Sequence, residues 1–182
     1  MVLQLNYLER LMIDLKYYKT HHLAYAPTFG TEGAACFDLY ASIVPGEYVL
    51  SYSRVSDMPS KIRVENKSLI IYPGDRMLVP VNLIFDIPEG YSLRAHPRSG
   101  LSLKQGLTLF NCTGVIDEDY VDPIFITMYN ISGLAQTIND GDSLAQANLQ
   151  EKIPTRLVET GGKPEQKTSR NGGFGSTGVN TN

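Results

Sequence analysis

Short runs of β-branched and aromatic residues recur along most of the chain and predict a protein built from β-strands. From about residue 33 onward the runs alternate with polar turn sequences, and they lie at residues 68–72, 77–85, 91–95, 124–131 and 156–159. Short strands with frequent turns are typical of barrels and sandwiches, not of alternating strands and helices. The pattern therefore predicts an all-β barrel or sandwich with little helix.

Turn sequences fall between several of these runs and support the same interpretation. They are Pro73-Gly74-Asp75, Pro88-Glu89-Gly90 and Asn139-Asp140-Gly141-Asp142. Proline fixes its own φ, whereas glycine and asparagine tolerate the positive φ that many turns require. The positions of strands and turns therefore agree.

Both ends of the chain and one internal segment depart from the strand pattern. Residues 6–14 place Leu8, Leu11 and Met12 on one helical face, which predicts a short helix. Residues 48–67 are polar and charged, and form either an inserted loop or an extra hairpin. Residues 161–182 are rich in glycine and poor in aliphatic side chains, so they form a flexible tail. We expect one β domain over residues 1–160, with an N-terminal extension and an insertion, followed by this tail.

Composition narrows the classes of function. A chain of 182 residues that is 42% hydrophobic can bury one core, which indicates a single domain. Its net charge of −3 offers no general attraction to nucleic acid or to an anionic membrane, so a phosphate site must be built locally. The two cysteines, Cys36 and Cys112, lie far apart, which argues against a zinc site and favours buried free thiols.

Targeting signals are not evident in the sequence. Charged residues at Glu9, Arg10 and Asp14 interrupt the apolar residues of the N-terminus, and no apolar run reaches membrane-spanning length. We therefore expect a soluble cytoplasmic protein that uses no membrane, located in the host cytoplasm if it is encoded by a virus.

Five segments concentrate charged, hydroxyl and glycine residues where plain strand alternation would be expected. In chain order they are GAACFDLYA (33–41), PRSGLSLKQG (97–106), NCTGVIDEDY (111–120), GDSLAQ (141–146) and RNGGFGSTG (170–178). Together, in order and approximate spacing, they resemble the five motifs of the trimeric dUTP diphosphatase family over about residues 16–178.

The resemblance implies a fold, a reaction and an assembly. It implies the dUTPase-like all-β fold of the β-barrel or jelly-roll type, and hydrolysis of dUTP to dUMP and pyrophosphate. That reaction limits uracil incorporation into DNA and supplies dUMP for dTTP synthesis. It also implies dependence on Mg²⁺ and a homotrimer in which the third segment and the tail of different chains complete each active site. No direct binding of nucleic acid is expected.

The third segment carries the candidate base and the candidate pyrimidine pocket. A carboxylate at Asp117 can deprotonate an attacking water, although aspartate also commonly caps a turn, and the resemblance implies the base. Tyr120 can pack on deoxyribose and exclude a 2′-hydroxyl, or it is a tyrosine of the β core. Asn111 offers an amide donor and acceptor for uracil, or forms an Asx turn before Gly114. The resemblance assigns substrate binding to Gly114 as well.

Three other segments carry candidate phosphate ligands. Arg98 has a charged fork, Ser99 a small hydroxyl, and Gly100 lets the backbone approach a phosphate closely, although such a run is usually a polar loop. Gln146 resembles a phosphate-contacting glutamine of the family, and a solvent-facing strand glutamine would look the same. Asp38 matches a carboxylate that lies near Mg²⁺, acting through the water shell of the ion.

The glycine-rich tail becomes a candidate lid through the resemblance. Glycines let the backbone wrap phosphates at Gly175, Phe174 can stack on a base, Ser176 adds a hydroxyl donor, and Arg170 can reach the terminal phosphate. The alternative is an ordinary flexible terminus.

The match to the family departs from the usual pattern at several places. The departures are Cys36 for the usual glycine, Ser143 for an arginine, Ser169 before a tail arginine that is displaced to position 170, Asp122-Pro123 after Tyr120, and the long segment at 48–67. Two other functions stay open. A dCTP deaminase of the same superfamily would release ammonia from dCTP. A nucleotide-binding regulatory protein would act through a partner, with residues 48–67 as a contact.

Overall fold

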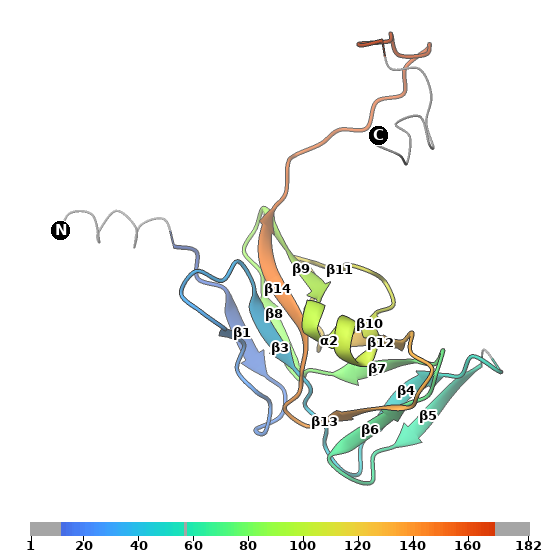
Figure 1. The fold of residues 1–182 in the computed structure, drawn as a ribbon. Helices are drawn as coiled ribbons and strands as arrows, with labels where there is room; N and C mark the ends of the chain where they lie inside the picture. The colour runs from blue at the N-terminus through green and yellow to red at the C-terminus, as the bar shows by residue number, and fades with distance from the viewer. Residues whose placement is uncertain (1–11, 57, 170–182) are drawn as a thin grey trace.

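Two five-stranded antiparallel sheets form the body of the computed structural model, which describes residues 12–56 and 58–169 (Figure 1). The first sheet has the order β11-β9-β14-β3-β2, with the bounds β11 Gly114–Asp117, β9 Tyr91–Pro97, β14 Ser143–Glu151, β3 Phe37–Tyr40 and β2 Thr28–Phe29. The second has the order β10-β12-β7-β4-β5, with the bounds β10 Leu107–Leu109, β12 Phe125–Asn130, β7 Arg76–Pro80, β4 Tyr48–Tyr52 and β5 Pro59–Arg63.

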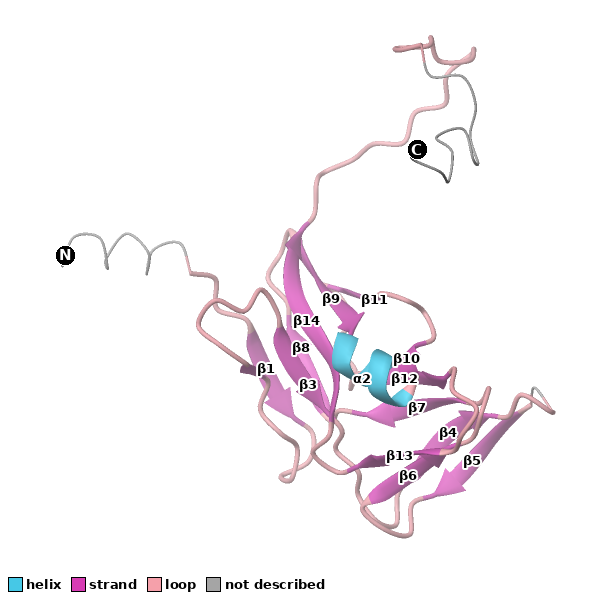
Figure 2. Ribbon diagram, in the orientation of Figure 1, coloured by secondary structure: helices cyan, strands magenta, loops and turns pink. Residues whose placement is uncertain are grey.

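Two short ribbons and one helix complete the described part of the chain. Strand β1 (Lys16–Lys19) pairs with β8 (Leu83–Asp86), and β13 (Gln136–Asn139) pairs with β6 (Ser68–Ile71). Helix α2 (Ser99–Gln105) is the one helix among the described residues, and it follows directly on β9 (Figure 2). The all-β architecture with little helix is confirmed. In the described segments no helix is long and apolar enough to span a membrane.

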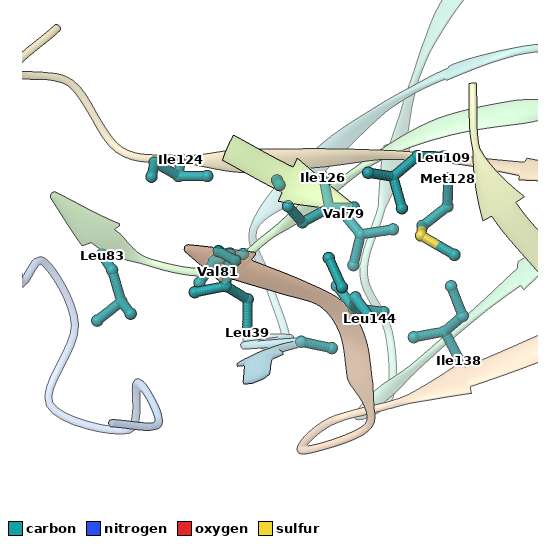
Figure 3. Packing of buried hydrophobic residues seen from close by; sticks show 14 of the residues in the cluster. Leu39, Val79, Val81, Leu83, Leu109, Ile124, Ile126, Met128, Ile138 and Leu144 are labelled. Carbon is teal, nitrogen blue, oxygen red and sulfur yellow. The ribbon is translucent and has the colours of Figure 1, made fainter. Parts of the chain in front are cut away.

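The core lies where the inner faces of the sheets meet. Leu39 of β3, Val79 of β7 and Leu144 of β14 are at most 1% exposed and converge in the packing shown in Figure 3. Leu93 and Met128 are fully buried in the same cluster. Burying a side chain of this size stabilises a fold by about 1.5–3 kcal/mol, so the alternating apolar positions of the strands hold the two sheets together.

One predicted strand is in fact two. The run at residues 77–85 is divided between β7 and β8, which belong to different sheets. The break is at Asn82, whose φ is 57° and whose amide nitrogen donates to the carbonyl and hydroxyl oxygens of Ser42. Asparagine tolerates the left-handed backbone better than a branched residue does, so the chain changes sheet here without losing its apolar pattern.

The prediction of a strand at residues 156–159 is wrong. The last strand, β14, ends at Glu151, and the following residues run away from the body as an extended segment (Figure 1). Leu157 is 94% exposed there. A strand needs a partner to satisfy its backbone hydrogen bonds, and this segment has none among the described residues of its own chain.

The remaining expectations have mixed outcomes. Within the segment predicted as an inserted loop or an extra hairpin, β4 and β5 pair antiparallel, and β4 also pairs with β7. The three predicted turns are present, with positive φ at Gly74, Gly90 and Gly141. The helix proposed for residues 6–14 lies mostly outside the described residues.

Candidate active site

A pocket of about 230 Å³ collects three candidate residues of the third sequence segment. Asn111, Gly114 and Tyr120 line it together with apolar residues of β9, β10 and β12. Asn111 lies in the tight connection from β10 to β11, where the N–H of Cys112 donates to Leu109 O at 3.1 Å. The pocket therefore has an apolar wall and an exposed amide at its edge, which suits a flat ring with polar edges.

Glycine at position 114 keeps this pocket open. Gly114 pairs with Ala95 across β11 and β9, and a Cβ at 114 would lie 3.3 Å from the Ala95 Cβ. The same added atom would lie 3.5 Å from Asn111 Nδ2. A larger residue would therefore fill the space beside the amide that is expected to read the base.

Tyr120 is held at the side of the pocket by two hydrogen bonds. Its N–H donates to Asp117 O at 3.1 Å, which closes a turn, and its hydroxyl donates to Pro123 O at 3.1 Å. The ring is 41% exposed, so it is not a buried core tyrosine. The unusual Asp122-Pro123 sequence thus supplies the carbonyl that orients the ring.

Asp117 is the last residue of β11, at the edge of the first sheet. Its side chain is exposed, and it does not line the pocket that contains Asn111. A base in this position is accessible to water but needs further groups to hold a phosphate near it.

A second, larger cavity of about 550 Å³ collects the candidate phosphate ligands. Arg98, Ser99, Gly100, Gln146 and Asp38 line it, and Lys104 of α2 lies in the same wall. These residues come from β3, β14, α2 and the junction of β9 with α2. The structure therefore brings the first, second and fourth sequence segments together, as expected for one anion site.

The guanidinium of Arg98 is fixed from two sides. Its Nε lies 3.3 Å from Asp38 Oδ1, and Nη1 donates to Ser143 O at 3.1 Å. Gln146 donates from Nε2 to Pro97 O at 3.0 Å, which leaves its second N–H for another acceptor. Ser143 contributes through its backbone carbonyl, so its side chain is not used in this contact.

The strand register separates the two groups of residues. Asp117 is opposite Ser92, and Asp38 is opposite Gln146, which is opposite His96. Ser92 and His96 are about 13 Å apart along β9, and β11 is about 14 Å from β3 across the sheet. Asp117 and Asp38 of one chain therefore lie about 20 Å apart on the same, outer face of the sheet.

The family of the chain follows from sequence comparison. The sequence profile of the dUTPase family matches residues 62–178. A protein named deoxyuridine 5′-triphosphate nucleotidohydrolase from Finegoldia magna is 40% identical over 129 residues, which cover 70% of this chain and 89% of that protein. The chain belongs to the dUTPase family.

Solved structures share the fold of this dUTPase. A variant of the Staphylococcus bacteriophage 80alpha dUTPase, solved with dUpNHpp, has a TM-score of 0.71 at 17% identity, covering 92% of this chain and all of that one. A dUTPase variant from phage phi11 of S. aureus, described with a structural Mg(II) ion, has a TM-score of 0.62 at 19% identity, covering 82% and 98%.

The donor set of the larger cavity is compatible with magnesium. Asp38 is the one carboxylate among its lining residues, and the described segments contain no cluster of three or more His, Cys, Asp or Glu side chains. Mg²⁺ prefers oxygen ligands, keeps several waters and commonly binds through one or two carboxylates plus substrate phosphates. A single carboxylate beside a phosphate site fits that mode of binding.

Some predictions about the site are untested or wrong, and some lining residues were not predicted. Arg170, Phe174, Gly175 and Ser176 lie outside the described residues. Cys112 is exposed with a φ of 60°, so the expectation that both cysteines are buried is wrong. Gly30, Thr31 and Ala34 line the larger cavity although the sequence interpretation assigned them no role, and the turn-forming glycines around them are the signal that could have indicated this.

Proposed function

We propose that this dUTPase hydrolyses dUTP to dUMP and pyrophosphate at sites shared between chains of a homotrimer. The observation that carries the proposal is the separation of about 20 Å between the candidate base and the candidate phosphate site of one chain. A base must come within about 3 Å of the water that it activates. A site with Asp117 from one chain and Arg98 from another meets that requirement.

The base pocket selects the pyrimidine and the sugar. Uracil enters the pocket beside Asn111, whose amide has both a donor and an acceptor for the ring edge. Tyr120 packs on the deoxyribose and leaves no space for a 2′-hydroxyl. Asp117 lies about 10 Å beyond Gly114 along β11. The deoxyribose spans this distance and places the α-phosphate near the Asp117 carboxylate.

The larger cavity of a neighbouring chain holds the phosphates. Arg98, Ser99 and Gln146 donate to phosphate oxygens, and the Asp38 carboxylate keeps the guanidinium of Arg98 in place. Asp38 would hold Mg²⁺ through water beside the phosphates, where the ion would supply positive charge for the triphosphate and its leaving group. The tail, with Arg170, Phe174, Gly175 and Ser176, closes over the substrate as a lid.

Hydrolysis needs one proton transfer and one displacement. The Asp117 carboxylate takes a proton from a water molecule as the water oxygen attacks the α-phosphorus. The bond from that phosphorus to the bridging oxygen breaks, and pyrophosphate leaves with charge stabilised by Arg98. No covalent intermediate with the protein is required.

A threefold arrangement is supported by two surface features. The outer face of the first sheet is polar, with His96 and Gln146 in its centre, and Asp117 and Asp38 at opposite corners. A cyclic oligomer packed on this face would bring the opposite corners of neighbouring chains together. The exposed apolar residues after β14, of which Leu157 is one, also support association.

The first test compares pyrophosphate release from dUTP, dCTP, dTTP and UTP for the wild type and Asp117→Asn. We expect rapid release from dUTP alone and its loss in the variant, with binding of dUpNHpp retained. Ammonia release from dCTP would instead identify a deaminase. Tight binding of dUTP without hydrolysis by the wild type would identify a regulatory protein.

A mixing experiment tests the shared site. Asp117→Asn and Arg98→Ala chains are each expected to be inactive alone. Co-assembled in equal amounts as a trimer, they restore both intact residues in about a quarter of the sites, so about a quarter of the activity returns. If no activity returns while mixed trimers form, the two residues act within one chain and the proposed assembly is wrong.

A further inference from the structure

Glu118, next to the candidate base, makes two short contacts that join three separate parts of the chain. Its Oε2 accepts a hydrogen bond from the N–H of Gly90 at 2.7 Å, and its Oε1 lies 2.6 Å from Lys152 Nζ. The N–H of Lys152 in turn donates to Gly90 O at 2.7 Å. The three residues therefore form a closed ring of contacts.

Each member of this ring lies next to the end of a strand. Glu118 follows β11, which is an edge strand and pairs only with β9 among the described strands. Gly90 lies in the tight turn from β8 to β9, with a φ of 84°. Lys152 is the first residue after β14, where the C-terminal segment leaves the body (Figure 1).

Electrostatics favour the charged form of the Glu118 side chain. The Lys152 ammonium, followed by the Gly90 N–H, lowers the pKa of the Glu118 carboxyl below its ordinary value. The Glu118 side chain is therefore charged at neutral pH, and each of its oxygens contacts one of these partners. Hydrogen bonds in which one partner is ionised are shorter and stronger than neutral hydrogen bonds.

We propose that Glu118 is a positioning residue: through Gly90 and Lys152 it fixes the turn that carries Asp117 and the direction in which the C-terminal segment leaves the barrel. This inference rests on the proposed role of Asp117 as the base. Asp117 precedes Glu118 directly, so a shift of the Glu118 backbone moves the end of β11. A displacement of about 1 Å in a reacting group can reduce the rate by about 100-fold.

Loss of the contacts among Glu118, Gly90 and Lys152 is expected to affect the chemical step more than substrate binding. The Tyr120 hydroxyl keeps its own anchor at Pro123 O, although the Tyr120 N–H donates to Asp117 O, and Asn111 and Gly114 lie at the other end of β11. Removing the ring therefore leaves the base pocket in place. Loss of kcat with a nearly constant KM is the signature of a misplaced catalytic group.

The test measures steady-state kinetics and dUpNHpp binding for Glu118→Ala, Glu118→Gln and Lys152→Met. We expect Glu118→Ala to lower kcat by about 10- to 100-fold while KM and the Kd for dUpNHpp change by less than about threefold. Glu118→Gln should lose less, because its amide oxygen still accepts from Gly90. Lys152→Met should also lower kcat, and combining it with Glu118→Ala should add little, since both break the same ring.

The matched control is Asp119→Ala, in the same turn. The exposed Asp119 side chain makes no hydrogen bond or ion pair within residues 12–56 and 58–169, so its removal should leave kcat unchanged. Thermal unfolding of every variant is measured alongside, and melting below the assay temperature in parallel with lost activity would overturn a positioning role in favour of a purely structural one.

Two failures remain distinguishable. If Asp117→Asn abolishes hydrolysis but Glu118→Ala keeps a kcat within twofold of the wild type, the positioning inference is wrong and the proposed function stands. If Asp117→Asn is fully active, the assignment of the base itself fails, and the inference about Glu118 falls with it.

Discussion

Replacing Gly114 by alanine should narrow the base pocket with little effect on the rest of the fold. The added Cβ would lie 3.3 Å from the Ala95 Cβ and 3.5 Å from Asn111 Nδ2, so its neighbours need to move by only a few tenths of an ångström. The methyl group nevertheless occupies part of a pocket of about 230 Å³. One carbon too many in a closely fitting pocket costs about 1–3 kcal/mol of transition-state binding, or about 10- to 200-fold in kcat/KM.

The assay is kcat/KM for dUTP together with the Kd for dUpNHpp. Both should worsen by a similar factor, because the methyl group blocks the base in the ground state and in the transition state alike. Overpacking costs at most about 1–3 kcal/mol of stability, so the protein should remain folded at the assay temperature. A folded Gly114→Ala protein with wild-type kcat/KM would refute the assignment of this pocket to uracil.

Gly133 provides the matched control for this substitution. A Cβ added at position 133 meets no atom within 4 Å, and its φ is not in the left-handed region. Gly133→Ala should therefore keep wild-type kinetics. If both variants lost the same activity, the effect at Gly114 would reflect a general response to alanine and not the pocket.

Three further substitutions test other parts of the structure. Asn130→Ala removes a fully buried amide that makes four hydrogen bonds, so the free energy of unfolding in urea should fall by about 2–4 kcal/mol, and a loss below about 0.5 would contradict the role of this amide. Partial burial and a hydrogen bond to Asp140 raise the pKa of Tyr25. The stability gained from the neutral phenol is therefore present below about pH 10 and lost as the pH rises through the higher folded pKa, so Tyr25→Phe should show a shallower alkaline loss of stability, and an unchanged slope would contradict this. Arg98→Lys cannot reach both Asp38 and the neighbouring carbonyl, so kcat/KM should fall by about 10- to 100-fold, and full activity would show that the guanidinium fork is not needed.

The strands could be predicted well where local pattern and tertiary pairing agree. Residues 91–95 and 124–131 carry aromatic and aliphatic residues and become β9 and β12 with only small changes in their bounds. Residues 143–151 largely alternate polar and apolar side chains and form β14, although they were not among the predicted runs. Local propensity is therefore reliable when a partner strand exists and the alternation is considered.

The errors arise where pairing decides the outcome. The run at 77–85 looks continuous because apolar residues persist through it, but Asn82 turns the chain from one sheet to another. The run at 156–159 has strand composition and no partner within the described part of its chain. Helix α2 was not predicted because Ser99-Gly100 is typical of a loop. In the structure the seven residues that follow Arg98 form a short helix between β9 and β10.

The candidate site shows the same division between local chemistry and long-range geometry. Short motifs indicated which residues can donate to phosphate, and four of the five segments have residues in the two cavities. The motifs could not indicate that these cavities share no lining residue, because that separation depends on the order β11-β9-β14-β3 and on its register. Motif order along the chain carries no information about distance across a sheet.

The ring of Glu118, Gly90 and Lys152 illustrates this limit most clearly. Glutamate, glycine and lysine at these positions have no distinctive spacing, and each alone is typical of an exposed turn. The three residues come into contact only because β9 pairs with both β11 and β14, which brings the ends of three segments to one corner of the sheet. Because that corner contains both the candidate base and the start of the C-terminal segment, one carboxylate can set the position of two parts of the proposed site. Kinetics on Glu118→Ala therefore test whether sheet pairing, and not motif sequence alone, places the candidate base.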